Sequence, residues 1–466
     1  MAAPTASRPT VFRLPNYRKL WTAATVSLFG TQVSQIAIPY IAAFVLRASP
    51  GEVGLLTAIE FLPFLLFTLP AGVWVDRFPK KRILVLGDLG RAAMLVSIPV
   101  AWWLDGLTIY QLYLVGFVNG LMTVLFDVAD MSYLPTILDR EDLVDGNAKL
   151  QISQSSAQIL GQPFGGGIVA VLQAPLAVLI DAASYVGSAG LILSIRDAGG
   201  RVAGAVRGAA ATESDAVDEG VAEAVAAANP EAIAESAAAT PGDAPGPTGG
   251  MRTQIREGLR YILGHEYLGN IAATTASSNL FGNIGLAIFP VFAYRELQMS
   301  PAAVGTMGGI GGVGVLIGAL IASRVQRRLG IGRTIVLTAA LFGPINVLFP
   351  LATPEVALLF LSTSLFLGGI SNVIYNVAQV SLRQAITPEH FLGRMNATMR
   401  FLVWGTIPIG ALIGAGLSEV VGVRSTIWIS AILTWFGFLP VLFSKVRTIR
   451  TIPTDDPEAA PSTPGA

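Results

Sequence analysis

The stretch Leu69-PAGVWVDRFPKKRILVLGDLG-Arg91 indicates what kind of fold this chain adopts. It joins an apolar run that ends at Val75 to a second apolar run that begins at Ile83. The turn between the two runs holds four basic residues within six positions, namely Arg77, Lys80, Lys81 and Arg82. Short loops rich in Lys and Arg stay on the cytoplasmic side of a membrane. The stretch therefore predicts a hairpin of two membrane-spanning helices with its tip in the cytoplasm.

The composition indicates an integral membrane protein. Of the 466 residues, 53% are hydrophobic and 13% charged, and the mean hydropathy is +0.62, whereas a soluble domain carries about 25% charged residues. The formal net charge is zero, which argues against a nucleic-acid partner. With no cysteine and two histidines we predict no metal site and no cofactor. The loops contain no nucleophile–base arrangement, so we do not expect an enzyme.

Twelve apolar runs are long enough to span a membrane. A bilayer core of about 30 Å needs about 20 apolar residues per helix. The runs are Leu20–Leu46, Val53–Val75, Ile83–Leu104, Ile109–Val128, Asn147–Leu172, Pro175–Ile195, Leu268–Ala293, Ala302–Ser323, Thr334–Leu351, Val356–Val380, Asn396–Leu417 and Thr426–Phe443. With the first hairpin inside, three of the 30 basic residues fall outside, Arg47, Arg295 and Arg424. This asymmetry predicts an all-α, multi-pass protein of the cell membrane with both termini cytoplasmic.

The spans divide into two halves around a polar segment. We predict a cytoplasmic N-terminus (1–19), a six-helix half (20–196), a disordered cytoplasmic linker (197–250), an amphipathic interfacial helix (251–266), a second six-helix half (267–444) and a disordered tail (445–466). The linker is rich in Ala, Gly, Pro and acidic residues and has too few large apolar residues to bury a core. The abundance of Ala, Gly and Arg is typical of a bacterial protein, and a monomer is expected.

The two halves repeat each other. Ser49-Pro50 followed by Val53-Gly54 recurs as Ser300-Pro301 followed by Val304-Gly305, an offset of 251 (300 − 49). Leu28-Phe29-Gly30 recurs as Leu280-Phe281-Gly282, and Asn147-Ala148 as Asn396-Ala397. The sequence therefore predicts two homologous six-helix repeats.

At the first hairpin the chain resembles the major facilitator superfamily of secondary transporters. The residues that carry the resemblance are Gly72, Asp76, Arg77, Lys80, Lys81 and Arg82, with Pro79 where the family usually has Gly. The resemblance implies alternating access, with substrate bound between the halves near the midplane. It also implies a gating role for this cluster, with Asp76 facing the positive end of a helix in the other half. The alternative is that the basic residues only set the topology. Ser323 replaces the acid in the second copy, so any such latch is asymmetric.

Three acidic residues in or at the ends of spans are candidates for proton coupling: Glu60, Asp181 and Asp127. A charged side chain inside a span costs about 2.5–3.5 kcal/mol, so its presence needs a reason. A carboxyl group in a low-dielectric environment takes up a proton more readily than one in water, as coupling to a proton gradient requires. A hydrogen-bonded structural role for Asp181 and a solvated or capping role for Asp127 are the alternatives. Asp88 has Arg91 nearby, which favours an ion pair.

Amide side chains form stripes at helical spacing on four spans. These candidates for the substrate cavity are Gln32, Gln35, Gln151, Gln154, Gln158, Asn279, Asn283, Asn372, Asn376 and Gln379. Amides facing lipid would be penalised, so they either join helices or line a wet cavity. An amide-lined cavity suits amphipathic organic molecules.

The fifth run carries Gly161-Gln162-Pro163-Phe164-Gly165-Gly166. Gly161, Pro163, Gly165 and Gly166 resemble the Gly-Pro-x-x-Gly-Gly motif of proton-driven drug exporters, displaced by Gln162, and the alternative is close packing of small residues. The buried Arg that the family carries in its fourth span is absent. We predict a secondary transporter that exports amphipathic small molecules in exchange for protons, with the proton motive force as its energy source. An uptake symporter is the alternative, followed by a membrane sensor without flux.

Overall fold

The computed structural model describes residues 11–139, 142–195 and 259–450, except for the side chains at 69, 73, 76, 389, 390, 393, 394, 397 and 400 inside helices. Within these ranges the chain consists of helices and short connecting turns, without a strand. The predicted linker 197–250 and most of the predicted tail lie outside the described residues, as does the Asp76 side chain.

The N-terminal half contains six helical segments. They are α1 (Pro15–Tyr40) with the π-helical turn η2 (Ile41–Val45), α2 (Pro50–Arg77), α3 (Lys80–Trp103), α4 (Ile109–Ile137), the broken segment α5 (Leu143–Ser156), η4 (Ala157–Gly161) and α6 (Gln162–Leu172), and α7 (Ala174–Leu193). A short 3-10 turn, η1 (Val11–Arg13), precedes α1.

The C-terminal half repeats this order. It contains α12 (Leu268–Leu286) with α13 (Phe289–Val291) and η5 (Phe292–Glu296), α14 (Pro301–Leu329), α15 (Ile331–Asn346) with α16 (Leu348–Leu351), α17 (Ala357–Ile386), α18 (Glu389–Val421), and α19 (Val423–Phe436) with α20 (Leu439–Leu442). A last 3-10 turn is η6 (Lys445–Thr448).

Helix starts show the internal repeat directly. Ser49 caps α2 and accepts a hydrogen bond from the Glu52 amide, and Ser300 caps α14 in the same way, from the Ala303 amide. A proline follows each serine at the first helical position, where its missing N–H costs nothing. Helices α3 and α15 begin at residues 80 and 331, again 251 apart. The predicted repeat is thus visible in the backbone.

Eleven described helical segments are long and apolar enough to cross a membrane. The fifth predicted span is the one that does not qualify by composition. It is helical from Leu143 to Leu172, but π-helical turn η4 interrupts it, and its glutamines lower its hydropathy. The all-α membrane fold is therefore confirmed, and the least apolar of its predicted spans is also the one with irregular backbone.

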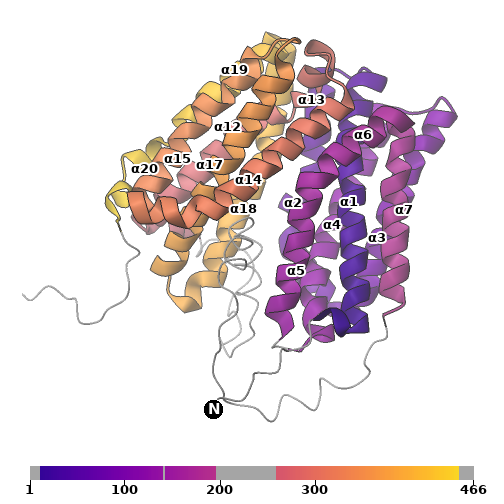
Figure 1. The fold of residues 1–466 in the computed structure, drawn as a ribbon, viewed down its shortest axis with the longest axis horizontal. Coiled ribbons are helices and arrows are strands. Elements are labelled where there is room, and N and C mark those ends of the chain that lie inside the picture. Colours follow the sequence, from indigo (N-terminus) through magenta and orange to yellow (C-terminus); the bar gives the residue numbers. More distant parts are fainter. Residues whose placement is uncertain (1–10, 140–141, 196–258, 451–466) are drawn as a thin grey trace, which may run out of the picture.

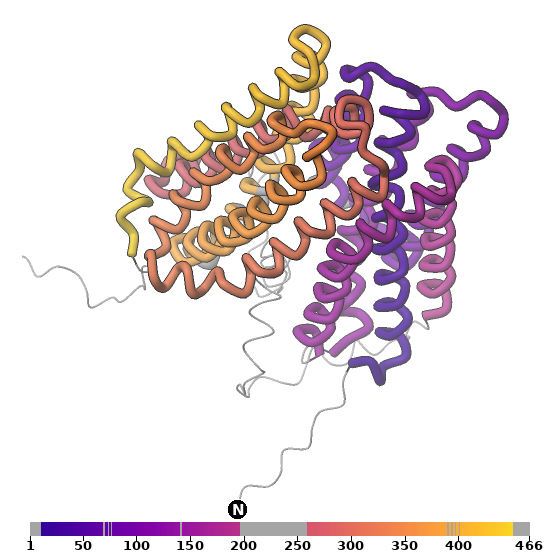
Figure 2. The backbone as a smooth tube through the Cα atoms, turned by 45° about the horizontal axis from the view of Figure 1, so that its top comes forward, coloured from indigo at the N-terminus to yellow at the C-terminus, as the bar shows by residue number. Residues whose placement is uncertain are grey.

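The two halves form two bundles that lie close together at one end and diverge toward the other, as the ribbon and the tube both show (Figures 1 and 2). We call the end that carries Arg77–Arg82 the basic end, and the opposite end, which carries Arg47, Arg295 and Arg424, the far end. The bundles approach each other at the far end, near α6 and α13. The main contacts between the halves run along α2 with α18 and along α6 with α14.

Several side chains hold the far end together. The Arg295 Nε donates to the Ala43 carbonyl at 2.5 Å, and the rings of Tyr40 and Tyr294 meet edge to face with centroids 4.8 Å apart. These contacts join η5 of the C-terminal half to the end of α1 and to η2 of the N-terminal half. The three basic residues predicted to lie outside therefore share the end where the halves touch.

The predicted interfacial helix is described only in its last part. Residues 259–264 are helical, and Ile262 is fully buried in a cluster with Leu268 and Ile271. The ring of Tyr261 stacks on Phe391, with centroids 4.5 Å apart. This part of the segment packs against the C-terminal half through the apolar face predicted for it.

Candidate functional site: two cavities and a buried charge network

The larger cavity lies inside the C-terminal half. It has a volume of about 630 Å³, and α12, α14, α15, α17 and α19 supply most of its wall. Among the described residues that line it, Gln162 of α6 is the only one from the N-terminal half. The lining combines amides and hydroxyls with the aromatic rings of Phe289, Phe342 and Phe349, and includes no Asp, Glu, Lys, Arg or His among the described residues. The cavity can therefore offer apolar contacts and uncharged hydrogen bonds.

The smaller cavity lies where the halves meet. Its volume is about 200 Å³, and it is lined by amides of α1, η4 and α6 on one side and by α14 on the other. Gln162 lines both cavities. Its Oε1 lies so close to Gly308 of α14 that any side chain at position 308 would displace it. Gln162 is thus part of the wall of both cavities.

Seven of the ten predicted cavity amides line one of these two cavities. Gln32, Gln35 and Gln158 line the smaller one, and Asn279, Asn283, Asn372 and Asn376 the larger one. Gln151, Gln154 and Gln379 line neither. Gln379 is 0% exposed and donates to the Asn376 Oδ1 at 3.1 Å. It therefore holds a lining residue in place without lining the cavity itself.

Several lining residues were not among the predicted cavity candidates. Gln162 continues the helical spacing of Gln151, Gln154 and Gln158 but was not counted with them, and Asn346, Ser430 and Thr434 were not singled out although all three line the larger cavity. Isolated polar residues in otherwise apolar runs were the available signal for these three. Such a residue does not show which neighbouring helix it faces.

The exporter-like motif lies at points of close backbone contact. A Cβ added at Gly165 would lie 2.8 Å from the Gln32 carbonyl oxygen of α1, and one at Gly166 would lie 3.0 Å from the Cα of Gly305 in α14. Gly161 approaches the Gln32 side chain, and Pro163 lies beside Gly309. The motif therefore lets α6 pack tightly on its own half and on the other half at once.

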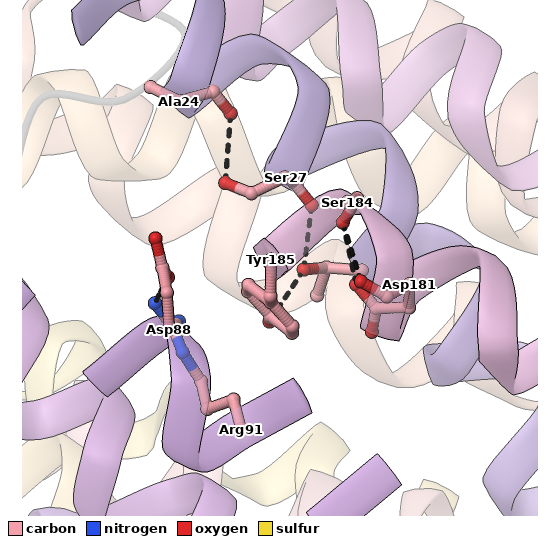
Figure 3. A network of polar contacts seen from close by, with 8 residues as sticks. Ala24, Ser27, Asp88, Arg91, Asp181, Ser184 and Tyr185 are labelled. Atoms are coloured by element: carbon pink, nitrogen blue, oxygen red, sulfur yellow. Dashed lines mark hydrogen bonds and ion pairs between the residues drawn. The ribbon is translucent and has the colours of Figure 1, made fainter. Parts of the chain in front are cut away.

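Buried charges gather in the N-terminal half, between α1, α3 and α7 (Figure 3). Arg91 Nη2 pairs with Asp88 Oδ1 at 2.5 Å, as the sequence spacing favoured, and the two side chains are 7% and 0% exposed. The guanidinium lies between the rings of Phe126 and Tyr185, at 4.4 and 4.3 Å from their centroids. Cation–π contacts of this kind are favourable when desolvated. The N-terminal half therefore contains a buried arginine, Arg91, on its third span, α3.

The three proton-coupling candidates have different surroundings. Asp181 is 2% exposed, and the Ser184 hydroxyl lies 3.3 Å from its Oδ1. Glu60 has an exposed side chain midway along α2, while its carbonyl oxygen faces Gly120 of α4. Asp127 is half-buried on α4, ten residues before the last residue of the helix (137 − 127), so it does not end this helix as the sequence suggested. Asp181 alone of the three belongs to the network in Figure 3.

The predicted gating cluster lies at the basic end. Gly72 is half-buried and open to added volume, and Arg77 and Arg82 are exposed. Lys81 donates through Nζ to the Ile195 carbonyl at 2.6 Å, and Lys19 to the Ser194 carbonyl at 2.5 Å. Both carbonyls follow the C-terminus of α7, where a helix leaves acceptors unsatisfied and favours positive charge. Lys81 thus has a structural partner within its own half.

Two repeated helical bundles that meet at one end and enclose polar cavities define the architecture of a secondary transporter. The model of the Major Facilitator Superfamily matches residues 20–271 and 267–465. The chain belongs to the Major Facilitator Superfamily.

Proteins similar in sequence to this chain are named as transporters or efflux proteins. The chain is 24% identical over 449 residues to the multidrug efflux pump Tap of Mycobacterium tuberculosis, covering 93% of this chain and 94% of that protein. It is 28% identical over 180 residues to the MFS-type transporter YfiS of Bacillus subtilis, 38% of this chain and 42% of that one. It is 25% identical over 165 residues to macrolide efflux protein A of Streptococcus pyogenes, 35% and 40% of the two chains.

Solved structures share the fold. A bacterial homologue of the iron transporter ferroportin in its inward-facing state matches with a TM-score of 0.63 and 16% identity, covering 93% of this chain and 99% of that one. The outward-facing state of that homologue matches with a TM-score of 0.51 and 15% identity, over 92% and 98% of the chains. Both matches show that this chain shares the fold of those proteins.

Proposed function

We propose that this protein is a proton-coupled exporter of amphipathic small molecules that works by alternating access. It is a transporter of the Major Facilitator Superfamily, and the observation that carries the proposal is the larger cavity, with its aromatic and amide lining. Its volume of about 630 Å³ falls within the range of about 300–1,000 Å³ typical of drug-sized ligands. The full-length similarity to a protein named as a multidrug efflux pump supports export as the direction.

In this proposal the basic end faces the cytoplasm of a bacterial cell, and both termini lie on that side. Substrate enters from the basic end, where the bundles diverge, while the contacts of Arg295 and Tyr294 keep the far end closed. The two halves then close around the substrate and open at the far end. Contacts along α2 with α18 and along α6 with α14 serve as the surfaces on which the halves rock.

Proton coupling in this scheme rests on the carboxyl groups of the N-terminal half. The Glu60 side chain is exposed within α2, and in this scheme it exchanges a proton with water that enters between the halves. Asp181 is buried beside Gly30 of α1 and Ser184 of its own helix. Asp127 lies on α4, ten residues before Ile137 (137 − 127). The described lining of the larger cavity includes no carboxyl group, so proton and substrate occupy separate places and must be coupled through movement of the halves.

The test uses inside-out vesicles with an acid interior and a panel of fluorescent amphipathic dyes. The expected result is dye uptake that an uncoupler abolishes and that Glu60→Gln strongly reduces. Loss of uptake in Asp181→Asn or Asp127→Asn, with Glu60→Gln active, would move the coupling role to that residue. Dye movement only in the opposite direction would favour an uptake symporter, and no gradient-dependent movement of any dye would contradict multidrug export.

A further inference from the structure

The larger cavity differs from the corresponding part of the N-terminal half in one decisive respect. Helices α3 and α15 begin 251 residues apart, so Arg91 and Phe342 occupy equivalent positions. In the N-terminal half Arg91 extends between Phe126 and Tyr185 and pairs with Asp88. In the C-terminal half Phe342 lines an open cavity instead. The buried guanidinium of the N-terminal half therefore has no counterpart at the equivalent position of the C-terminal half.

The cavity retains unused hydrogen-bonding groups. Thr434 is 3% exposed, lines the cavity, and its Oγ1 has no hydrogen-bond partner among the described residues. The buried Oγ of Ser278, another lining residue, likewise lacks a partner within the described ranges. A buried polar atom without a partner is costly. Both hydroxyls therefore keep unused hydrogen-bonding capacity at the wall of the cavity.

The amides add acceptors to these hydroxyls. The Asn279 and Asn283 side-chain nitrogens donate to the carbonyls of Thr275 and Asn279 on their own helix, at 3.0 and 2.8 Å. Their side-chain oxygens are left to accept from a molecule in the cavity. Three phenylalanine rings, Phe289, Phe342 and Phe349, supply the apolar part of the wall.

We propose that this cavity binds an uncharged amphipathic molecule that carries both hydroxyl or amide groups and an aromatic or aliphatic body. The inference rests on the proposed export function and narrows its substrate class. A charged ligand would lose its hydration in a cavity whose described lining offers no counter-ion, and burying an unpaired charge is expensive. Cation–π attraction to the phenylalanines is weaker than that penalty. Gln162 is the one residue of the N-terminal half among the described lining residues, so a molecule in the cavity contacts that half there.

The experiment measures direct binding to the purified full chain by scintillation proximity, without any gradient. The probes are tritiated chloramphenicol, which is uncharged and carries hydroxyl and amide groups, and tritiated tetraphenylphosphonium, a permanent cation. We expect wild type to bind the uncharged probe more tightly. Thr434→Val keeps the shape but removes the hydroxyl, and should weaken chloramphenicol binding about five- to tenfold.

Asn283→Asp places a carboxylate in the cavity and should reverse the preference, with tighter binding of the cation and weaker binding of chloramphenicol. The matched control is Asn270→Asp on the same helix, since Asn270 donates to the Glu266 carbonyl in an exposed position and does not line the cavity. Melting temperatures close to that of wild type establish that each variant is folded. If Asn283→Asp does not fold, Thr434→Val and the wild-type preference decide the question.

Tighter binding of tetraphenylphosphonium to wild type, or unchanged chloramphenicol binding in Thr434→Val, would overturn the inference. Gradient-driven transport of cationic dyes without chloramphenicol binding would also overturn it, while leaving the export proposal intact. Conversely, the expected binding pattern without gradient-driven transport in vesicles would support the cavity assignment and count against the export proposal.

Discussion

The Glu419 carboxylate accepts a 2.7 Å hydrogen bond from the Gly51 amide, which links the last turn of α18 to the first turn of α2 across the two halves. Ser49 and Glu52 already form a capping box at this helix start, so the Gly51 N–H is a donor that the box leaves free. A Cβ at position 51 would lie 2.7 Å from the Glu419 Oε1, so glycine permits the contact. The far end is thus held by a carboxylate of one half at a helix N-terminus of the other.

Glu419→Gln should shift the protein toward the form that is open at the far end. A carboxylate at an exposed helix N-terminus contributes about 0.3–1 kcal/mol, so the ratio of open to closed forms should rise roughly two- to fivefold. Because the chain contains no cysteine, spin labels at Asp105→Cys and Leu351→Cys can report the far-end distance by pulsed electron resonance. Glu355→Gln, at the same end, is the charge-matched control, and equal distance distributions in both variants would rule out a latch.

Gly166→Ala should impair transport, whereas Gly167→Ala should not. A methyl group at 166 meets the backbone of α14 near Pro301 and Gly305, while one at 167 finds no atom within 4 Å. The first substitution therefore separates α6 from α14, and the second leaves the contact intact. Dye uptake into vesicles at matched protein levels is the measurement. Equal loss in both variants would point to helix propensity or expression instead of the contact between the halves.

Arg91→Leu should destabilise the protein strongly, by about 3–5 kcal/mol in the free energy of unfolding, because it leaves Asp88 buried without its partner. The Asp88→Asn, Arg91→Leu double variant should recover much of this loss, since removing both charges together is often close to neutral. Chemical unfolding in detergent provides the values for a double-mutant cycle. Additive losses in the cycle would show that the 2.5 Å ion pair is not the source of the effect.

Stability should decrease as the pH falls through the range in which His265 titrates. Its Nδ1 accepts hydrogen bonds from the amides of Tyr267 and Leu268, at 3.2 and 3.4 Å, and burial lowers the pKa of His265 below the usual value of a histidine. The unfolded chain then binds more protons than the folded one, so this contribution is present above pH 6.5 and is lost as the pH falls through the folded-state pKa.

The measurement for this prediction is the melting temperature in detergent between pH 7.5 and about 5. His265→Asn keeps a side-chain acceptor at the start of α12 but does not titrate, so the difference between wild type and variant should grow with acidity. A constant difference across the range would assign the pH dependence to other groups.

Much of the candidate site could be anticipated from periodicity. The stripe that begins at Gln151 and the pair Asn372 and Asn376 were expected to face inward, because amides are costly in lipid. From the sequence they either join helices or line a wet cavity. The structure divides the lining amides between a cavity at the interface and a larger one inside the C-terminal half. Which helix an amide faces depends on packing between segments far apart in the chain.

The helical spans and the two repeats could be read from the sequence. Each of these depends on local composition or on direct comparison of segments, as at Leu69–Arg91 or Ser49 and Ser300. It took the folded chain to show that Arg91 fills one half while Phe342 lines a cavity in the other, and that Gln162 lines two cavities. The physical reason is that a cavity is what remains when helices distant in sequence fail to fill the space between them. The volume of the cavity depends on the side chains of all these helices together, so it cannot be predicted from any one segment of the sequence.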